Sequence, residues 1–204
     1  MSLAEPEAGR AATGSAIPGN AGTAGNAGTG PSAPVVLDAE AIRRATKRMA
    51  HEIAERDPEV GGLVLVAIPR GGVPVAELIA AQLREITGTE VPLGTLDVTL
   101  YRDDVIARGY RPVPRPTRMP FRVAGKRVVL VDDVMFTGRT IRAAMDAILD
   151  FGRPAAIQVA TLVDRGHREL PIKVDFVGKN VPTARSQQIV LRRDARGELE
   201  VVIQ

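Results

Sequence analysis

The segment VVLVDDVMFTGRTIRAAMDAI, residues 128–148, combines an apolar run, an acidic pair, a polar turn and an amphipathic pattern. The apolar run predicts a buried strand that ends at Asp132 and Asp133, and the pattern after it predicts a helix over 138–151. A helix N-terminus carries unpaired backbone N–H groups and the positive end of the helix dipole. A turn that reads Thr-Gly-Arg-Thr at this point therefore indicates a phosphate site, formed by Thr137, Gly138, Arg139 and Thr140.

The acidic pair indicates a second ligand group beside that phosphate. Two adjacent carboxylates repel one another unless something positive or hydroxylated lies between them. A ribose diol, bound directly or through Mg²⁺, meets this need at Asp132 and Asp133. The alternative is a plain strand-to-helix turn with an exposed acidic pair and a threonine that caps the helix.

Short apolar runs alternate with amphipathic helix patterns on both sides of this segment. Strands are expected over 63–68, 91–101, 128–133 and 155–164, and helices over 39–57, 72–86 and 138–151. Asp38 stands where a residue would cap the first helix. This alternation predicts an α/β fold with a mainly parallel sheet that is flanked by helices on both faces, and ligands bind such sheets at the carboxyl ends of the strands.

Composition excludes several kinds of site. The 204 residues contain no cysteine and only two histidines, which rules out disulfides, a thiolate nucleophile and cysteine-ligated zinc. Aromatic residues make up 3%, too few for a platform that stacks single-stranded bases. No apolar run is long enough to cross a membrane, and residues near the N-terminus show neither the charged nor the apolar region of a signal peptide, so we expect a cytoplasmic protein. A pI near 9.7 favours anionic partners.

Residues 1–34 differ from the rest of the chain. They are rich in Gly, Ala, Pro, Ser, Thr and Asn, and AGTAGNAGTG at 21–30 repeats almost in register. Such a segment has too little apolar surface to offset the entropy of ordering it. We expect a flexible, low-complexity extension over 1–34 and one folded domain over 35–204.

VVLVDDVMFTGRT, residues 128–140, resembles the phosphoribosyl pyrophosphate (PRPP) signature of the type I phosphoribosyltransferases. LDVTLYRDD at 96–104 and DRGHRELPI at 164–172 resemble one branch of that family, the pyrimidine operon regulators that are also uracil phosphoribosyltransferases. The resemblance covers residues 35–204. It implies a type I phosphoribosyltransferase fold with a small hood over the strand ends.

The resemblance also implies a reaction, in which uracil and PRPP give UMP and diphosphate with Mg²⁺ as cofactor. Asp132 and Asp133 would hold the ribose hydroxyls, and the turn after them the 5-phosphate. The family binds pyrophosphate at a loop that commonly reads Thr-Arg-Gly, where this chain has Arg70, Gly71 and Gly72. A purely structural glycine turn is the alternative there.

Residues 101–127 carry eight Lys or Arg and two Asp. Loops of this length are usually lids or disordered. The segment matches the family's mobile loop over PRPP, with Arg102, Asp103 and Asp104 as expected contacts, and a merely solvated basic loop is the alternative. Purine enzymes of the family carry an aspartate at the place of Phe136, so a pyrimidine base is favoured.

Base recognition in the family comes from the hood. By resemblance alone, the expected contacts are Asp164 and Arg165, with the stretch around Lys179 and Asn180. His167 has two open interpretations, an RNA contact or a hydrogen-bonded residue of the hood.

The first helix combines an apolar face with a basic one. Ile42, Ala45, Met49 and Ile53 share the apolar side, and the opposite side carries Arg43, Arg44, Lys47, Arg48 and His51. An ordinary solvated face is one explanation. The family binds a stem-loop of pyr messenger RNA on a basic surface of its dimer, more tightly with UMP or UTP, which implies a homodimer or higher homo-oligomer. The implied RNA contacts are Lys47, His51, Arg168, Lys173 and Lys179.

Three hypotheses follow. The first is a bifunctional protein, an RNA-binding regulator that responds to UMP and has uracil phosphoribosyltransferase activity. The second is a regulator with weak or lost catalysis, suggested by the altered loop at Arg70. The third is a salvage phosphoribosyltransferase with no role in RNA binding.

Overall fold

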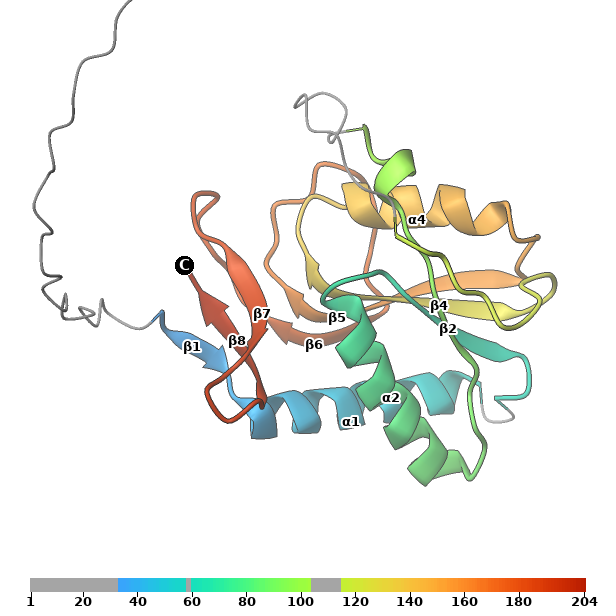
Figure 1. Cartoon of the computed structure of the whole chain (residues 1–204), viewed down its shortest axis with the longest axis horizontal. Helices are drawn as coiled ribbons and strands as arrows, with labels where there is room; N and C mark the ends of the chain where they lie inside the picture. Colours follow the sequence, from blue (N-terminus) through green and yellow to red (C-terminus); the bar gives the residue numbers. More distant parts are fainter. Residues whose placement is uncertain (1–32, 58–59, 104–114) are drawn as a thin grey trace, which may run out of the picture. The chain divides into compact units, whose positions relative to one another are not determined.

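A five-stranded parallel sheet in the order β3-β2-β4-β5-β6 forms the centre of the fold (Figure 1). Its strands are β2 (Leu63–Ala67), β3 (Leu93–Thr95), β4 (Arg127–Met135), β5 (Ala156–Asp164) and β6 (Phe176–Asn180). The computed structural model describes residues 33–57, 60–103 and 115–204, so the expected extension lies almost wholly outside the described residues.

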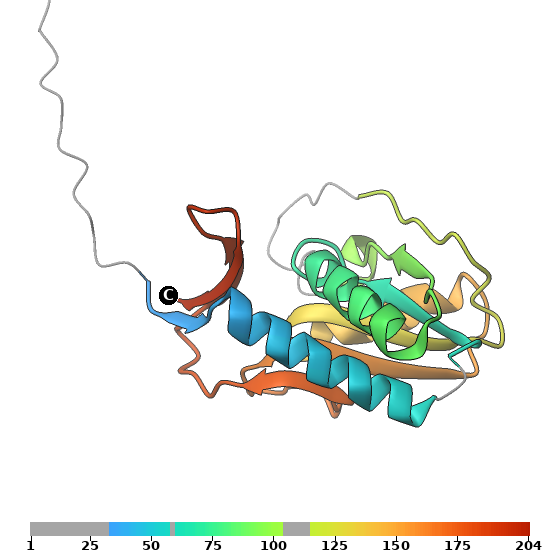
Figure 2. The same ribbon diagram turned by 90° about the horizontal axis from the view of Figure 1, so that it is seen from below.

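Helices cover both faces of this sheet, as the alternating pattern predicts. In Figure 1, α4 (Arg139–Leu149) lies above the sheet, whereas α1 (Ala39–Arg56) and α2 (Gly72–Thr87) lie below it. Figure 2, seen from below, shows α1 and α2 crossing in front of the strands. The three predicted helices are confirmed to within two residues at each end.

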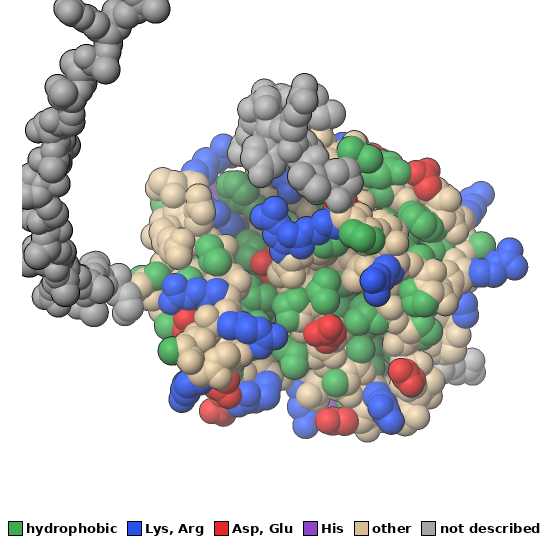
Figure 3. Space-filling model, viewed as in Figure 1, with side chains coloured by type: hydrophobic (Ala, Val, Ile, Leu, Met, Phe, Trp, Pro, Cys, Tyr) green, Lys and Arg blue, Asp and Glu red, His purple; other side chains and the backbone are tan. Residues whose placement is uncertain are grey.

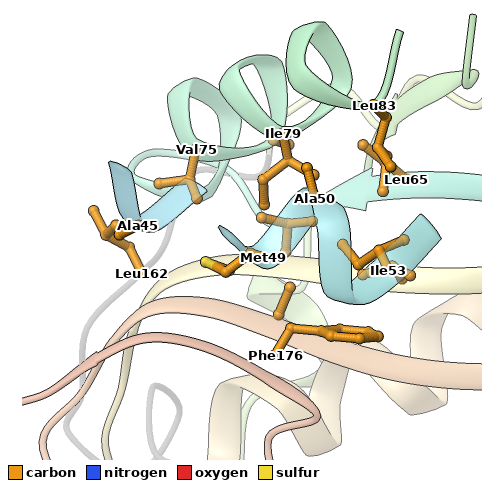
Figure 4. Close-up of a cluster of buried hydrophobic side chains, with 14 of the residues drawn as sticks. Ala45, Met49, Ala50, Ile53, Leu65, Val75, Ile79, Leu83, Leu162 and Phe176 are labelled. Carbon is orange, nitrogen blue, oxygen red and sulfur yellow. The ribbon is translucent and has the colours of Figure 1, made fainter. Parts of the chain in front are cut away.

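Two apolar cores result, one on each face. Successive residues of β4 point to opposite faces of the sheet. Val129 therefore belongs to the core between the sheet and the helices α1 and α2, and Leu130 belongs to the core between the sheet and α4. Figure 4 shows the first core, where Met49 of α1, Ile79 of α2 and Phe176 of β6 meet; all three are fully buried.

The first helix begins at its expected cap. The Asp38 carboxylate accepts a hydrogen bond from the Ala41 N–H at 2.7 Å. All four residues of the predicted apolar face are buried, and all five residues of the basic face are exposed. The two faces of α1 are therefore as the sequence predicts.

The strand expected over 91–101 is wrong beyond Thr95, where β3 ends. The chain turns at Asp97, whose carboxylate accepts hydrogen bonds from the Thr99 N–H (3.1 Å), the Thr99 hydroxyl (2.6 Å) and the Arg115 N–H (2.6 Å). A short 3₁₀ helix, η1 (Thr99–Tyr101), follows. Local side-chain bonds to the backbone compete here with a sheet ladder, which apolar periodicity does not reveal.

The strand that carries the acidic pair continues two residues beyond its predicted carboxyl end, to Met135. Pairing with β2 ends where Ala67 faces Val131, but pairing with β5 continues to the Met135–Asp164 pair. The last four residues of β4 therefore have a neighbouring strand on one side only. This step at the carboxyl edge of the sheet is where a ligand can approach the backbone.

A small antiparallel sheet stands beside the main one, at the left in Figure 1. Its order is β1-β8-β7, with β1 (Val35–Leu37), β7 (Ile189–Arg193) and β8 (Leu199–Ile203). Ile189 and Val201 are buried in the same core as α1. This sheet corresponds to the expected hood, although its strands were not predicted individually.

Among the helices of the described residues, none is long and apolar enough to span a bilayer.

Candidate functional site

Three loops meet at the step in the sheet. They surround a cavity of about 370 Å³ that is lined by the loop after β2, the segment after β3, the acidic pair of β4 and the start of α4. The lining includes Arg70, Gly71, Thr99, Arg102, Asp132, Asp133 and Thr140. Residues expected to bind the ribose, the pyrophosphate and the lid side of PRPP thus border one cavity.

Asp132 is the buried member of the acidic pair. Its side chain is 7% exposed, and its carboxylate accepts a hydrogen bond from the Asp133 N–H at 3.0 Å. Burial raises the pKa of Asp132 well above its ordinary value, the charge of Asp133 adds to that effect, and the positive charge of Arg102 opposes it. A cation or a hydroxyl donor between the two carboxylates would relieve this destabilised charge.

The glycine pair lets the loop after β2 approach the acidic pair. A Cβ on Gly72 would lie 2.4 Å from the Val131 carbonyl oxygen, and one on Gly71 would overlap the Asp133 carboxylate. The two glycines therefore have a structural role, because they let the expected pyrophosphate loop lie directly against Asp133.

Arg70 has an unusual backbone conformation in this loop. Its φ is +85°, in the left-handed region that costs a non-glycine residue about 1–2 kcal/mol. Its side chain is exposed, and no hydrogen bond or ion pair joins it to another of the described residues. Strained conformations of this kind are concentrated at functional sites, and here the strain presents a cation beside the acidic pair.

The expected phosphate turn surrounds a second cavity, of about 450 Å³. Gly138 stands at the N-cap of α4 with φ +93° and has no side chain to cap the helix, while the Arg139 N–H donates a long hydrogen bond to the Thr137 hydroxyl at 3.4 Å. The N–H groups that follow in the first turn of α4 are available to an anion. The lining includes Thr137, Gly138, Arg139 and Thr140, together with Arg102, Asp132, Glu169 and Arg185.

Arg139 in this turn is paired with two carboxylates. Its guanidinium lies 2.7 Å from Asp103 and 3.0 Å from Glu169, and Arg185 lies 3.7 Å from the same glutamate. The hydrogen bond to Glu169 and the charge of Asp103 raise the pKa of Arg139. Glu169 and Arg185 were not predicted; Glu169 lies within DRGHRELPI, but nothing in that spacing indicates that its side chain reaches the start of α4.

Arg165 and Phe136 form a stack on the hood side of the site. The guanidinium carbon of Arg165 lies 4.1 Å from the centre of the Phe136 ring. Arg165, 6% exposed, donates to the Thr183 hydroxyl and the Ala184 carbonyl, both at 2.9 Å. Burial lowers the pKa of Arg165. The stack fixes the segment that leads into β7, and Thr183 and Ala184 are further residues that sequence reasoning missed.

His167 packs against the same stack. Its ring lies 5.7 Å from the Phe136 ring in an edge-on arrangement, and Nε2 lies 2.6 Å from the Thr183 carbonyl oxygen. Of the two open interpretations, this geometry favours the hydrogen-bonded residue of the hood.

Asp164 lies away from that stack. Its carboxylate accepts hydrogen bonds from both terminal nitrogens of Arg168 and from the Gly166 N–H. It lines a separate open depression with Arg168 and Lys173, and is not among the residues that line the two cavities above. A direct contact of Asp164 with the base stays a prediction.

The expected RNA contacts surround the edge strand β6. Lys47 and His51 are exposed on α1, which packs against β6; Lys179 is exposed within β6; Lys173 lies in the loop before it. The Arg168 side chain is 25% exposed, with part of its guanidinium bound to Asp164 and to the Phe136 carbonyl. Arg48 donates to the carbonyls of Val177 and Gly178 on β6, so its role is at least partly structural.

Basic side chains do not form one continuous patch on the face drawn in Figure 3, where Lys and Arg are mixed with Asp and Glu.

Within the expected lid loop, residues 101–127, Asp104 and the residues up to 114 lie outside the described residues.

No group of three or more His, Cys, Asp or Glu side chains gathers as a metal cage within the described ranges. The acidic pair offers two carboxylates. Mg²⁺ is commonly bound by one or two carboxylates together with substrate phosphates and water, so this donor set fits a Mg²⁺ ion that arrives with its ligand.

Residues 35–192 match the phosphoribosyl transferase domain family. Curated relatives named "Bifunctional protein PyrR" are 56% identical in Pelotomaculum thermopropionicum, over 82% of this chain and 93% of the relative, and 61% identical in Roseiflexus sp., over 77% and 86%. The Thermus thermophilus relative of the same name is 56% identical, over 77% and 87%.

Solved structures show the same fold at low identity. The hypoxanthine phosphoribosyltransferase of Trypanosoma cruzi aligns with a TM-score of 0.63 and 21% identity, over 83% of this chain and 94% of that one. A hypoxanthine-guanine phosphoribosyltransferase of Bacillus anthracis aligns with a TM-score of 0.58 and 20% identity, over 73% and 84%.

Proposed function

This chain belongs to the phosphoribosyl transferase family and, within it, to the PyrR proteins, and from that premise we propose how its residues divide the work. The protein is a regulator that responds to pyrimidine nucleotides, binds pyr mRNA and controls genes of pyrimidine biosynthesis. It also catalyses the reaction of uracil with PRPP to give UMP and diphosphate.

The acidic pair positions the ribose. In the reaction the bond between C1 and the pyrophosphate oxygen breaks, the bond between C1 and N1 of uracil forms, and the proton of N1 passes to the departing diphosphate. Positive charge develops on the ribose as the pyrophosphate leaves. Asp132 and Asp133 accept hydrogen bonds from the ribose hydroxyls and lie on the side of the ring where their charge stabilises that change.

Cations on the other side of the cavity hold the departing pyrophosphate. Arg70 and the N–H groups of Gly71 and Gly72 border its place, and Arg102 and Asp103 close over it from the start of the lid. Asp132 and Asp133 would hold a Mg²⁺ ion that arrives with PRPP, and the ion would supply further positive charge. The main support for this assignment is the exposed guanidinium of Arg70, which bonds to no other residue of the described ranges.

The start of α4 binds the 5-phosphate. Thr137, Gly138, Arg139 and Thr140 all line one cavity, where backbone N–H groups, two hydroxyls and a guanidinium are the donors for the phosphate. Gly138 makes this turn with a φ of +93°, a conformation that favours glycine.

Uracil lies between the hood and Phe136. Phe136 offers no carboxylate to exchange a proton with a purine, and the Arg165 stack beside it shapes a site for a smaller ring. Arg165 acts through Thr183 and Ala184, to which it donates, so that main-chain groups of the hood can read the edge of the base.

The RNA stem-loop is bound by five basic residues: Lys47, His51, Arg168, Lys173 and Lys179. Their placement on three elements around β6 supports one shared surface, completed by a second copy in a homodimer or higher homo-oligomer. Few aromatics are present, so phosphates and folded shape supply most of the affinity, and loop bases supply the selectivity. PRPP and messenger RNA are both found in the cytoplasm, where we place the protein, with residues 1–34 as an extension to domain 35–204.

One observation carries the catalytic assignment: the acidic pair, the Arg70 loop and the start of α4 border the same cavity. Purified protein mixed with PRPP, Mg²⁺ and uracil, hypoxanthine or orotate in turn tests it. We expect nucleotide formation with uracil but not with hypoxanthine or orotate, and we expect Asp133→Asn to lose this activity. Turnover with hypoxanthine or orotate but not uracil would overturn the assignment, and no turnover at all would leave a regulator without catalysis.

The regulatory half is tested by titrating pyr leader RNA in gel shifts with and without UMP. We expect binding that is sensitive to salt and tighter with UMP. Binding no stronger than to an unrelated stem-loop would instead indicate a salvage enzyme without an RNA role.

A further inference from the structure

The loop between β5 and β6, residues 165–175, is attached to the phosphate turn; we name it the linking loop. Three successive carbonyls, from the end of β4 to the first residue of that turn, accept hydrogen bonds from it: Met135 from the Arg165 N–H (3.1 Å), Phe136 from the Arg168 guanidinium (3.2 Å) and Thr137 from the Glu169 N–H (3.0 Å). A displacement of the turn therefore pulls directly on the linking loop.

Glu169 adds an electrostatic contact at the same place. Its carboxylate lines the phosphate cavity and pairs with Arg139 at 3.0 Å and Arg185 at 3.7 Å. The Glu169 carboxylate thus lies in a cavity that is expected to bind a negatively charged phosphate. Its side chain is 33% exposed, so it is able to swing out toward solvent.

A bound 5-phosphate and the Glu169 carboxylate compete for the same guanidinium. The phosphate carries close to two negative charges, repels the carboxylate, and offers Arg139 a stronger partner. Occupancy of the phosphate turn and the Arg139–Glu169 pair are therefore mutually opposed.

Two of the expected RNA contacts, Arg168 and Lys173, lie in the linking loop itself. Arg168 is the residue before Glu169, and Lys173 follows within the same loop; both line the open depression next to Asp164. Arg168, the chain neighbour of Glu169, bonds at the same time to Asp164 and to the Phe136 carbonyl, so its position depends on that of the residues before the phosphate turn.

We propose that Glu169 is the residue through which nucleotide occupancy is transmitted to the RNA-binding surface. A bound 5-phosphate takes over Arg139, Glu169 is released, and the linking loop moves Arg168 and Lys173 into their RNA-binding arrangement. This inference rests on the proposed function, since it assigns the regulation of the same nucleotide site. Linkage requires that RNA tighten nucleotide binding by the same factor.

Glu169→Gln tests the proposal, because it removes the charge and keeps the size of the side chain. The measurements are the Kd for pyr leader RNA with and without UMP, and the Kd for UMP by calorimetry. In the unsubstituted protein we expect UMP to tighten RNA binding by about 5-fold or more, the usual range of such couplings. In Glu169→Gln we expect tighter RNA binding without UMP, less than about 2-fold further gain on adding it, and tighter UMP binding without RNA.

Asp103→Asn is the matched control. It removes the other carboxylate from Arg139, but Asp103 is not part of the linking loop. We expect this variant to bind UMP more tightly and to keep the full effect of UMP on RNA binding. Glu198→Gln, an exposed glutamate of the β7–β8 turn, should change neither quantity.

The outcomes separate this inference from the proposed function. If UMP does not affect RNA binding by the unsubstituted protein, the proposed function has failed. If UMP acts there and acts equally on a folded Glu169→Gln, the inference alone is overturned. Should Glu169→Gln not fold, Glu169→Asp, which shortens the reach to Arg139, is expected to weaken the effect of UMP, and an undiminished effect would refute it.

Discussion

A Cβ placed on Gly71 would lie 1.9 Å from Oδ2 of Asp133. The loop after β2 and the acidic pair of β4 are thus in direct contact, although 61 positions separate them in the sequence. The family resemblance implies an arginine at the position of Gly71, and in this chain the cation stands one position earlier, at Arg70.

Gly71→Ala should therefore displace Asp133. A shift of about 1 Å in a positioning group can lower a rate about 100-fold, so we expect a loss of kcat of that order with the fold retained. Gly62→Ala is the matched control, because nothing lies within 4 Å of its added Cβ. Steady-state kinetics of UMP formation measure both, and full activity in Gly71→Ala would show that the contact is not needed.

Substitutions of Arg70 should separate strain from charge. Arg70→Gly and Arg70→Ala both remove the cation, so both should raise the KM for PRPP. Only glycine is relaxed at a φ of +85°, so we expect Arg70→Gly to be more stable than Arg70→Ala by about 1 kcal/mol. Urea unfolding compares the two variants; equal stability would argue against strain at this position.

Asp132→Asn should stabilise the free protein in a pH-dependent manner. Burial raises the pKa of Asp132 above its ordinary 3.8, so the folded state binds a proton that the unfolded state releases. The free energy of unfolding therefore falls as the pH rises from 3.8 to the folded-state pKa of Asp132. The total loss is about 1.4 kcal/mol for each unit by which the folded-state pKa exceeds 3.8. The gain from Asp132→Asn should be small at pH 4 and largest at pH 8, as measured by thermal unfolding.

Asp194→Asn gives the opposite sign for comparison. Burial alone raises the pKa of Asp194, but hydrogen bonds from the N–H groups of Glu198 and Arg196 outweigh it and lower the pKa. Its contribution to stability is present above 3.8 and lost as the pH falls. Asp194→Asn should therefore destabilise the protein at pH 7, and parallel pH profiles for the two variants would contradict both assignments.

Arg165→Lys should weaken uracil binding more than it slows the chemical step. Lysine lacks the planar fork that bonds Thr183 and Ala184 while it stacks on Phe136. Loss of a charged hydrogen bond costs about 1.5–3 kcal/mol, so the KM for uracil should rise about 10-fold or more, with kcat changed less. The exposed Arg153→Lys should have no effect, and a fall in kcat at constant KM would assign Arg165 to catalysis instead.

Lys47→Glu should weaken RNA binding and lower its dependence on salt. Each lost phosphate contact reduces the slope of log K against log salt by about 0.7–0.9. Arg84→Glu, a similar charge reversal in the last turn of α2, lies on a helix without predicted RNA contacts and should leave the slope unchanged. Equal losses in the two variants would mean that net charge, rather than the surface around β6, determines binding.

Local sequence patterns predict the layers of the α/β fold and most of the expected ligand-binding groups. Apolar runs and helical periodicity are local properties, so β2, β4, β5 and the three helices were predictable, as were the acidic pair and the phosphate turn that follow one strand. The resemblance of 164–172 to one branch of the family added the regulatory role.

Which distant groups share a site depends on the tertiary structure. The turn at Asp97 depends on an N–H group 18 residues away, the contact of Gly71 with Asp133 depends on the pairing of β2 with β4, and the reach of Glu169 to Arg139 depends on how the linking loop crosses the start of α4. These contacts arise from packing between separate elements, and periodicity along the chain carries no information about the distance between them.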